Sequence, residues 1–426
     1  MKLWDKGYTT NNIVDKYTTG KDRMLDLKLA KHDVTGSIAH AKMLQSIGIL
    51  SEDELAAVLK GLSEIQKTID DGTFTIEDTF EDVHSKIEFE LVHKIGEAGK
   101  KIHTARSRND QVLVDLHLYT KAEILEIKEG IKKLFDTLIE LSAKHKNVLI
   151  PGYTHLQVAM PSSFGLWFAS YAESLIDDVI LLNAAYKISN QNPLGSAAGY
   201  GSSFPINRTM TTELMEFETL KYNVVAAQMS RGRLEKTTSF AMASVSSTLS
   251  KMASDVCLYM SQNFNFLSFP KELTTGSSIM PHKQNPDVFE LLRAKSNKIQ
   301  NLPTEITLIT NNLTSGYHRD FQLLKENYME AIDTLKDNLE VANFMLQHVV
   351  VNENSVDDSI YDYMYSVEEV NKLVLSGMTF RDAYKKLGAE IFGGQFSPDK
   401  KVNHSHEGSI GNLCLKEIQH KFDSNY

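Results

Sequence analysis

Apolar residues recur at helical spacing through long stretches of this sequence. After Ser51, leucines, valines and isoleucines return every three or four residues until Gly72, which is the spacing of one face of an α-helix. Ser51 and Glu54 form a capping-box sequence, and glycine is a frequent helix end. A second run of this kind covers residues 110–142. The pattern therefore predicts long amphipathic helices.

The prolines agree with this prediction. None of the nine lies before residue 151 and none lies between residues 303 and 398, so helices there can continue without interruption. Further helices are predicted over residues 230–265 and 319–350, and another with its first turn at Pro161. The alternating pattern of half-buried strands is nearly absent.

Helices of this length exceed the needs of a compact domain. About 30 residues at 1.5 Å per residue extend for about 45 Å, and such helices bury their apolar faces in bundles that oligomers often extend. We therefore predict an all-α protein with a helical N-terminal domain (1–109), a central long-helix bundle (110–350) and a small helical C-terminal domain (351–426).

Composition narrows the class of protein. The 426 residues carry a formal net charge of −10, which argues against nucleic acid as a partner. Cys257 and Cys414 lie far apart, without metal-ligand spacing. No apolar run approaches membrane-spanning length, and MKLWDKGYTTNN lacks the apolar core of a signal peptide. We expect a soluble, cytoplasmic protein without a membrane partner.

Four polar segments interrupt the helical pattern near predicted helix ends. They are EDVHSKIE (81–88), HTARSRNDQV (103–112), PGYTHLQ (151–157) and TTGSSIMPHKQNPD (274–287). Backbone N–H groups at helix starts favour anions, so each segment is a candidate binding site.

Two of the segments also have an ordinary structural explanation. Arg106 and Arg108 could bind a carboxylate through both arginines, or pair with surface acids beside a helix cap. His155, after Thr154 and a proline-glycine turn, could act as a general acid or base, or only hydrogen-bond within the turn. Taken singly, each is better explained by structure than by catalysis.

The composition of segment 274–287 favours a carboxylate-binding loop over a surface loop without a function. Ser277 and Ser278 supply hydroxyls and amides, Lys283 supplies a positive charge, and Asn285 before a proline is typical of an N-cap and first helical position. These groups could cradle a carboxylate and stabilise the negative charge that builds on it when an adjacent proton leaves. A flexible surface loop accounts for the glycine and serines, but less readily for the MPHK sequence that leads into a capped helix.

The segments resemble a known family. TGSSIMPHKQNPD is similar to the signature loop of the fumarase/aspartase superfamily, whose members eliminate fumarate or a close analogue from a substituted succinate. The resemblance narrows to the argininosuccinate lyase family, and extends from about residue 3 to beyond 390. It rests on HTARSRNDQV, PGYTHLQ, GSIAHAKML (36–44), EDVHSKIE, PLGS (193–196), FPINR (204–208) and YHRDFQLLKE (317–326).

The resemblance implies a reaction and an assembly. The reaction is the reversible cleavage of argininosuccinate, a small molecule, to arginine and fumarate in arginine biosynthesis, with no cofactor and no metal. The assembly is a homotetramer whose central helices form a twenty-helix core. Each composite active site would use loops from three subunits.

Residue roles carry over to matching positions. Ser277 matches the base that removes a proton from the carbon beside the retained carboxylate. Thr154 and His155 match the pair that assists the departing guanidinium. Glu290 matches the carboxylate that orients this histidine, and Lys283 the cation that binds the fumarate half. Substrate-binding positions match at Ser37, His84, Arg108, Asn109, Ser278, Asn285, Tyr317, Arg319, Gln322 and Lys325.

The sequence departs from the family pattern in places that bear on the substrate. Ala105 stands for the usual glycine, and Val158 and Met160 stand where arginine and glutamine are usual. MSRGR (229–233) replaces a segment that reads closer to SDRDF, with Arg231 in register, and residues 361–371 also diverge. A related amidino- or aminosuccinate is therefore an alternative substrate.

Two rival functions and one possible metal site complete the hypotheses. Adenylosuccinate lyase, which has a purine substrate, would need a different phosphate site that is rich in arginine and serine. The sequence SRNDQ (107–111) argues against this function. A non-catalytic structural protein on this scaffold would have no reason to keep the proposed catalytic residues together. The histidines of HSHEGSIGNL (404–413) could suggest a metal, but no third ligand is spaced nearby, so we favour a structural terminal segment.

Overall fold

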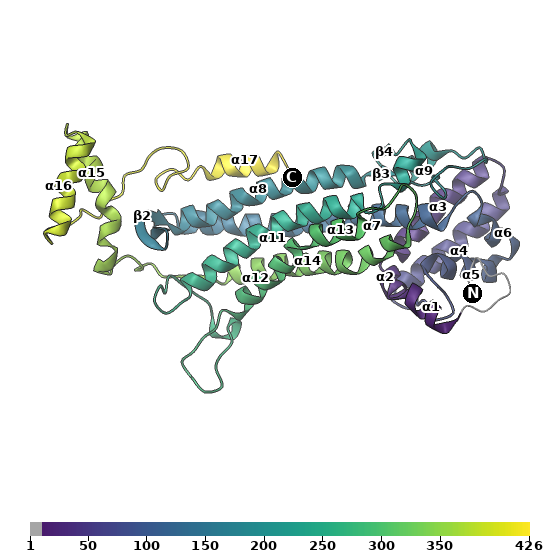
Figure 1. Cartoon of the computed structure of the whole chain (residues 1–426), viewed down its shortest axis with the longest axis horizontal. Coiled ribbons are helices and arrows are strands. Elements are labelled where there is room, and N and C mark those ends of the chain that lie inside the picture. Colours follow the sequence, from purple (N-terminus) through teal and green to yellow (C-terminus); the bar gives the residue numbers. More distant parts are fainter. Residues whose placement is uncertain (1–10) are drawn as a thin grey trace. The chain divides into compact units, whose positions relative to one another are not determined.

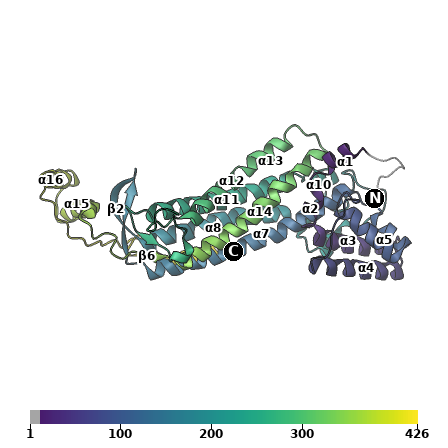
Figure 2. The ribbon, with the colours of Figure 1, turned by 90° about the horizontal axis from the view of Figure 1, so that it is seen from below.

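The computed structural model describes residues 11–426 and is mostly helical, with little strand, which confirms the predicted predominance of helix. Figures 1 and 2 show the ribbon from two directions. The α-helices are α1 (Asn12–Thr19), α2 (Asp22–Asp26), α3 (Ala30–Ser46), α4 (Glu52–Asp70), α5 (Val83–Ile95), α6 (Glu97–Lys100), α7 (Arg108–Lys144), α8 (Phe164–Ser189), α9 (Arg208–Leu214), α10 (Val224–Gln228), α11 (Arg233–Tyr259), α12 (Asp287–Gln300), α13 (Leu302–Thr310), α14 (Leu324–Gln347), α15 (Ser366–Leu375), α16 (Phe380–Phe392) and α17 (Leu415–Asp423).

Short elements join these helices. The 3-10 helices are η1 (Lys101–His103), η2 (Lys271–Leu273), η3 (Arg319–Leu323) and η4 (Ser359–Tyr365). The strands form three two-stranded sheets: β1 (Leu149–Thr154) with β2 (Gln157–Ser163), β3 (Gln191–Asn192) with β4 (Thr219–Leu220), and β5 (Leu267–Ser268) with β6 (Val350–Val351). Among the described helices, none is long and apolar enough to span a membrane.

The predicted long helices are present close to their predicted bounds. The Ser51 hydroxyl accepts the Glu54 N–H at 3.2 Å, and the Glu54 carboxylate accepts the Ser51 N–H at 2.9 Å, so the capping box at the start of α4 is confirmed. The predicted helix at Pro161 is displaced, because Pro161 pairs with Pro151 in the β1–β2 hairpin and α8 begins at Phe164.

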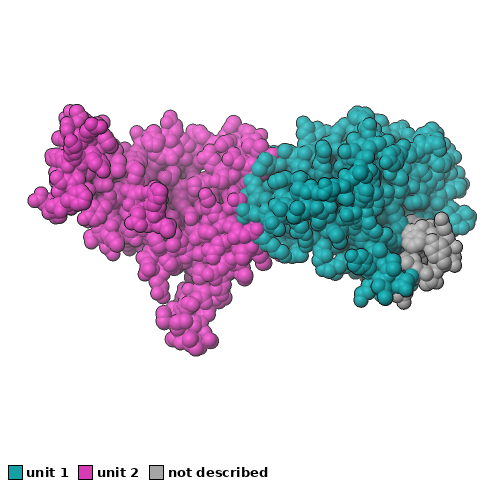
Figure 3. Space-filling view, viewed as in Figure 1, with its two compact units in different colours: residues 1–127, 181–244, 298–335 teal, residues 128–180, 245–297, 336–426 magenta. Residues whose placement is uncertain are grey.

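The chain forms two compact units, coloured separately in Figure 3. Unit 1 comprises residues 1–127, 181–244 and 298–335, of which the structure describes those from 11 onward; unit 2 comprises residues 128–180, 245–297 and 336–426. The boundaries fall within the long helices, so α7, α8, α11 and α14 each contribute to both units.

Two apolar clusters pack the described part of unit 1 around the helices that carry the site. Helices α3, α4 and α5 enclose one of them, in which Val34, Leu62 and Leu91 are fully buried. A β-carbon at Gly61 would lie 2.8 Å from a methyl group of Leu91, so the glycine permits α4 and α5 to approach closely. The second core joins α3 to the first turns of α7 through residues such as Val114.

Unit 2 is a helical bundle whose helices are also linked by polar bonds. Thr137 of α7 donates to Asn343 of α14 at 2.7 Å, and Trp167 and Tyr171 of α8 both donate to Asp255 of α11. Buried polar groups need such partners, so these pairs fix how the helices pack. Helices α15 and α16 form a small separate core.

Candidate active site

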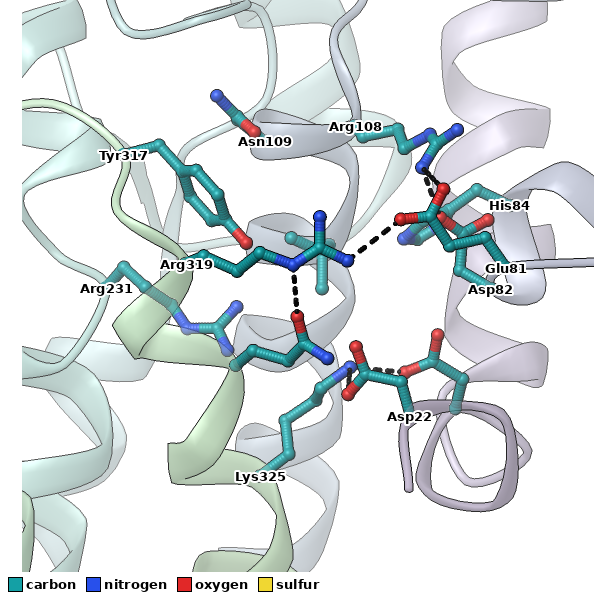
Figure 4. Close-up of a pocket in the computed structure, with 13 residues that line it drawn as sticks. Asp22, Glu81, Asp82, His84, Arg108, Asn109, Arg231, Tyr317, Arg319 and Lys325 are labelled. Atoms are coloured by element: carbon teal, nitrogen blue, oxygen red, sulfur yellow. Dashed lines mark hydrogen bonds and ion pairs between the residues drawn. The ribbon is translucent and has the colours of Figure 1, made fainter. Parts of the chain in front are cut away.

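Unit 1 contains a cavity of about 290 Å³, shown in Figure 4. It brings together seven of the predicted substrate-binding residues: His84, Arg108, Asn109, Tyr317, Arg319, Gln322 and Lys325. Its other lining residues are Asp22, Asp26, Glu81, Asp82, Val112 and Arg231. Residues distant in the sequence therefore meet at one polar site.

Helices α5, α7 and α14 begin at this cavity. His84 lies in the first turn of α5, Arg108 and Asn109 in the first turn of α7, and Lys325 in the first turn of α14. The unpaired N–H groups and the dipole of a helix N-terminus favour negative charge. The cavity is therefore suited to carboxylates, whether they belong to the protein or to a ligand.

The arginines are held by carboxylates of the protein itself. Arg108 Nη1 lies 3.0 Å from Glu81 Oε2 and 2.9 Å from Asp82 Oδ2, and Arg319 Nη2 lies 3.0 Å from Glu81 Oε1. Glu81 thus bridges two arginines (Figure 4). Asp82 also caps α5 by accepting the N–H of Ser85 at 2.8 Å. With both signs of charge in one cavity, the site suits a ligand that carries carboxylates and a cationic group.

Lys325 is buried between two aspartates. Its Nζ lies 2.7 Å from Oδ1 of Asp22 and 2.7 Å from Oδ1 of Asp26. Burial by itself would lower the pKa of Lys325, but the charges of Asp26 and Asp22 outweigh it, and the pKa is raised. Burial raises the pKa of Asp22 from 3.8 to about 6, although Lys325 opposes this shift. The lysine is therefore charged at neutral pH.

The raised pKa of Asp22 predicts a pH-dependent stability. Between about pH 6 and 3.8 the folded chain keeps a proton on Asp22 that the unfolded chain has lost, so stability rises as the pH falls through this range. Above pH 6 the ionised carboxylate costs up to about 3 kcal/mol. We expect Asp22→Asn to raise the free energy of unfolding at pH 7 by about 1–3 kcal/mol, and to lose this pH dependence.

Urea unfolding at pH 7 and pH 4.5 tests this prediction. Asp337→Asn is the control, because its side chain is exposed on α14, and it should behave like the unsubstituted protein. If Asp22→Asn were less stable at pH 7, the ion pair with Lys325 would outweigh the cost of burying Asp22.

A buried polar network lies behind His84. Asp33 Oδ2 accepts hydrogen bonds from His84 Nδ1 and, at 2.9 Å, from Gln111 Nε2. Burial opposes the charge on His84, but Asp33 outweighs it and raises the pKa of the histidine. His84 is thus held as an imidazolium. Burial, together with the nearby charge of Asp33, raises the pKa of the neighbouring Asp115 well above its usual value, which favours the neutral form of this carboxyl group.

Ser37, predicted to bind substrate, belongs to this network and is not among the residues that line the cavity. Its hydroxyl lies 3.2 Å from Asp33 Oδ1 and accepts a hydrogen bond from Arg106 Nη1 at 3.0 Å. Ser37 is only 1% exposed. In this structure it orients Arg106 and Asp33 and does not face the cavity.

Within the described residues, one group has ligand atoms close enough to hold a metal: Asp33, His84 and Asp115. The charge of Asp33 is already balanced by His84, and Arg106 adds a second positive charge near both carboxyl groups. His84 and Arg106 therefore supply the positive charges that face the carboxyl groups of this cluster. In the tail, His404 bonds Glu368 at 2.9 Å, which supports a structural role for that segment.

Thr154 and His155 lie at a tight hairpin turn in unit 2. Thr154 ends β1 and pairs with Gln157, and the two turn residues His155 and Leu156 have φ of 53° and 59°. Such values strain residues other than glycine. The predicted proline-glycine turn is wrong: Pro151 and Gly152 lie within β1, where a register irregularity follows Gly152. The turn leaves His155 exposed.

The loop 273–287 folds back on itself ahead of α12. Asn285 N–H donates to the Thr275 carbonyl at 2.9 Å, and the Asn285 side chain donates to the Gly276 carbonyl at 3.2 Å. The expectation that Asn285 caps α12 is therefore wrong: its amide closes the loop, and α12 begins at Asp287. Local sequence favoured a cap because asparagine before proline often supplies one.

Ser277 has a local environment that stabilises negative charge on its oxygen. Its Oγ accepts the N–H of Ile279 at 3.3 Å and the N–H of Met280 at 3.2 Å. Hydrogen bonds to a charged form lower the cost of producing it. The neighbouring hydroxyl of Ser278 makes no hydrogen bond with the described part of the chain.

Comparisons with known proteins agree with the residue pattern. A family model described as a lyase matches residues 8–301. The argininosuccinate lyase of Parabacteroides distasonis is 58% identical over 98% of this chain and 94% of its own length. This chain belongs to the argininosuccinate lyase family. The corresponding enzymes of Bacteroides fragilis and Thermotoga neapolitana are 57% and 39% identical over 98% and 92% of this chain, and over 94% and 98% of their own lengths.

Solved structures show the same fold at low sequence identity. EDDS lyase in complex with formate has a TM-score of 0.78 at 20% identity, over 98% of this chain and 90% of that one. Class II fumarase from Schistosoma mansoni has a TM-score of 0.72 at 15% identity, over 97% and 95%. The argininosuccinate lyase family thus shares its fold with other fumarate-related lyases.

The cavity also contains residues that the comparison of motifs with the argininosuccinate lyase family did not single out. Glu81 and Asp82 open the motif EDVHSKIE, and Arg231 lies in the segment MSRGR (229–233). Asp22 and Asp26 lie one helical turn apart on the short helix α2. That spacing is common on solvated helix faces, so no local pattern indicates that both aspartates face a buried lysine.

Proposed function

We propose that this protein is an argininosuccinate lyase that cleaves argininosuccinate reversibly to arginine and fumarate in arginine biosynthesis, as the names of its relatives indicate. The cavity in unit 1 is the structural observation that carries the proposal. Its lining combines four carboxylates with four arginine or lysine side chains and His84. Argininosuccinate carries three carboxylates, an ammonium and a guanidinium, so it requires both signs of charge.

The proposed chemistry uses the side chains of unit 2. Ser277 takes the proton from the carbon next to a carboxylate, and the amides beneath its oxygen stabilise the alkoxide that acts as base. Lys283 and Asn285 bind that carboxylate while negative charge builds on it, and Ser278 is a neighbouring donor. The carbon–nitrogen bond then breaks, fumarate forms, and the guanidinium leaves with arginine. Thr154 and His155, oriented by Glu290, assist the departing group.

We also propose that the active site is completed by other subunits. The residues proposed for binding lie mainly in unit 1, and those proposed for catalysis lie in unit 2. The side chains of His155, Lys283 and Glu290 are exposed and make no hydrogen bond or ion pair with the described part of the chain. Catalytic groups must be held in place by contacts with their neighbours. A neighbouring subunit of a homotetramer would supply these contacts. The division into domains 1–109, 110–350 and 351–426, the twenty-helix core and a cytoplasmic location belong to the same proposal.

The rival functions differ in what the cavity must hold. A purine nucleotide substrate would bring a phosphate, and the sequence SRNDQ (107–111) argues against the phosphate site that it would need. A related amidino- or aminosuccinate would fit the same chemistry. A structural protein would show none of the activity.

The decisive measurement follows the ultraviolet absorbance of fumarate. Purified protein is mixed separately with argininosuccinate, adenylosuccinate and aspartate. We expect fumarate from argininosuccinate alone. Fumarate from one of the other compounds would support the same reaction on that substrate instead. If a well-folded oligomer released no fumarate from any of them, the proposed activity would be refuted.

Mixing inactive variants tests the composite site. We expect Ser277→Ala and Arg108→Ala each to be nearly inactive, and a mixture of the two, dissociated and reassociated, to recover part of the activity. Activity is recovered if the intact loop 273–287 of an Arg108→Ala subunit meets the intact first cavity of a Ser277→Ala subunit. The control mixes Ser277→Ala with Lys283→Ala, whose changes share one loop, and should recover nothing. Equal results from both mixtures would contradict a site shared between subunits.

A further inference from the structure

Unit 1 contains a second cavity, of about 240 Å³, whose charged lining residues are all cationic. Arg233 and Lys236 of α11 line it, together with Arg231, which also lines the first cavity. Among the described residues that line this second cavity, none is acidic. In a protein with a net charge of −10, this is a local concentration of the opposite sign.

Two of these cations are not neutralised by the fold. The side chains of Arg233 and Lys236 make no hydrogen bond or ion pair with the described part of the chain. Arg233 also lies near a third cation, Lys221, whose pKa is lowered by burial and further by the charge of Arg233. Like charges gathered without an acid repel one another, and a bound anion would relieve that repulsion.

The wall of the cavity is fixed by tight packing. Arg231 donates from Nη2 to the Phe321 carbonyl at 2.8 Å and pairs with Glu235 at 2.9 Å. Between the arginines, Gly232 has φ of 81°, and a β-carbon there would lie 2.8 Å from Thr310 Cγ2. The side chain of Arg231 is therefore occupied and held in place, whereas Arg233 is available to a ligand.

We propose that this second cavity binds a small dianion, of the phosphate or dicarboxylate class, between Arg233 and Lys236. Ser315 also lines the cavity and supplies a further hydroxyl donor, whereas the hydroxyl of Thr310 already donates to the Ile306 carbonyl at 2.8 Å. Its volume corresponds to about eight liquid waters, which is enough for such an anion with part of its hydration shell. None of the proposed catalytic or substrate-binding residues lines the cavity, and Arg231 is the residue that it shares with the first cavity.

Calorimetric titration with inorganic phosphate, at constant ionic strength, tests the proposal. The full-length protein is compared with the double variant Arg233→Gln, Lys236→Gln and with the control Arg381→Gln, Lys385→Gln, which removes the same charges from exposed positions on α16. We expect phosphate to bind the control as it binds the unsubstituted protein. The affinity of the cavity variant for phosphate should be at least about 10-fold lower, because charge-assisted hydrogen bonds are lost.

A parallel titration with succinate should show the same difference between the variants, and the ratio of the phosphate and succinate affinities of the unsubstituted protein shows which class of anion the cavity prefers. Anion binding in the first cavity is common to all three proteins, so it does not mask the result. Equal phosphate affinity in the cavity variant would overturn the proposal. An equal loss in both variants would also overturn it, since it would show a general effect of net charge. Loss of subunit association in the cavity variant, without a change in phosphate binding, would assign the cations to a protein interface.

Discussion

Replacing Ser277 with alanine should lower kcat by about 10²–10⁴-fold, the range for removal of a positioned base. The hydroxyl oxygen accepts two backbone N–H groups, from Ile279 and Met280, and no other serine of the loop has this pair. Methyl replacement removes the base but leaves both amides exposed to water. The fold and the oligomer should therefore persist, with little change in KM.

Initial rates of fumarate release at several substrate concentrations separate the two parameters. Ser278→Ala is the matched control, since it removes an adjacent hydroxyl that makes no hydrogen bond with the described part of the chain. We expect it to affect KM more than kcat. Near-normal kcat in Ser277→Ala would show that another group is the base. An equal fall in kcat for both variants would implicate the shape of the loop instead.

Replacing Lys325 with methionine should destabilise the protein by about 3–5 kcal/mol at pH 7, the usual cost of removing one partner from a buried ion pair. Lys325 is 4% exposed and Asp26 is 1% exposed. Methionine matches the aliphatic stem of lysine but leaves two carboxylates without their cation. Part of the loss should be recovered near pH 5, because the pKa of Asp22 is raised to about 6 and its protonation then removes one unpaired charge.

The shift in the midpoint of urea unfolding at pH 7 and pH 5 measures this effect. Lys298→Met is the control: its ammonium lies 2.7 Å from Glu330, but the side chain is 74% exposed, and exposed pairs contribute little. Adding Asp26→Asn to Lys325→Met should restore much of the stability. If Lys325→Met unfolded at the same urea concentration as the unsubstituted protein, the lysine would not be holding the two aspartates.

The site could be predicted from the sequence only where its residues lie in motifs. EDVHSKIE, HTARSRNDQV and YHRDFQLLKE each supply cavity residues, and each is a motif that the sequence alone indicates. The hairpin at His155 was missed because Pro151, Gly152 and Pro161 are typical of turns and helix starts. Pairing between β1 and β2 outweighed those local preferences.

The sequence by itself determined the helices and the family. Apolar residues three and four apart specify one helical face through contacts between near neighbours, and the capping box of Ser51 and Glu54 is complete within four residues. Only the tertiary structure decided which charges meet. Asp26 and Lys325 are 299 residues apart in the sequence, and no local pattern relates them. Their contact exists because α2 and the first turn of α14 pack together in unit 1, and burial then makes the pair energetically important.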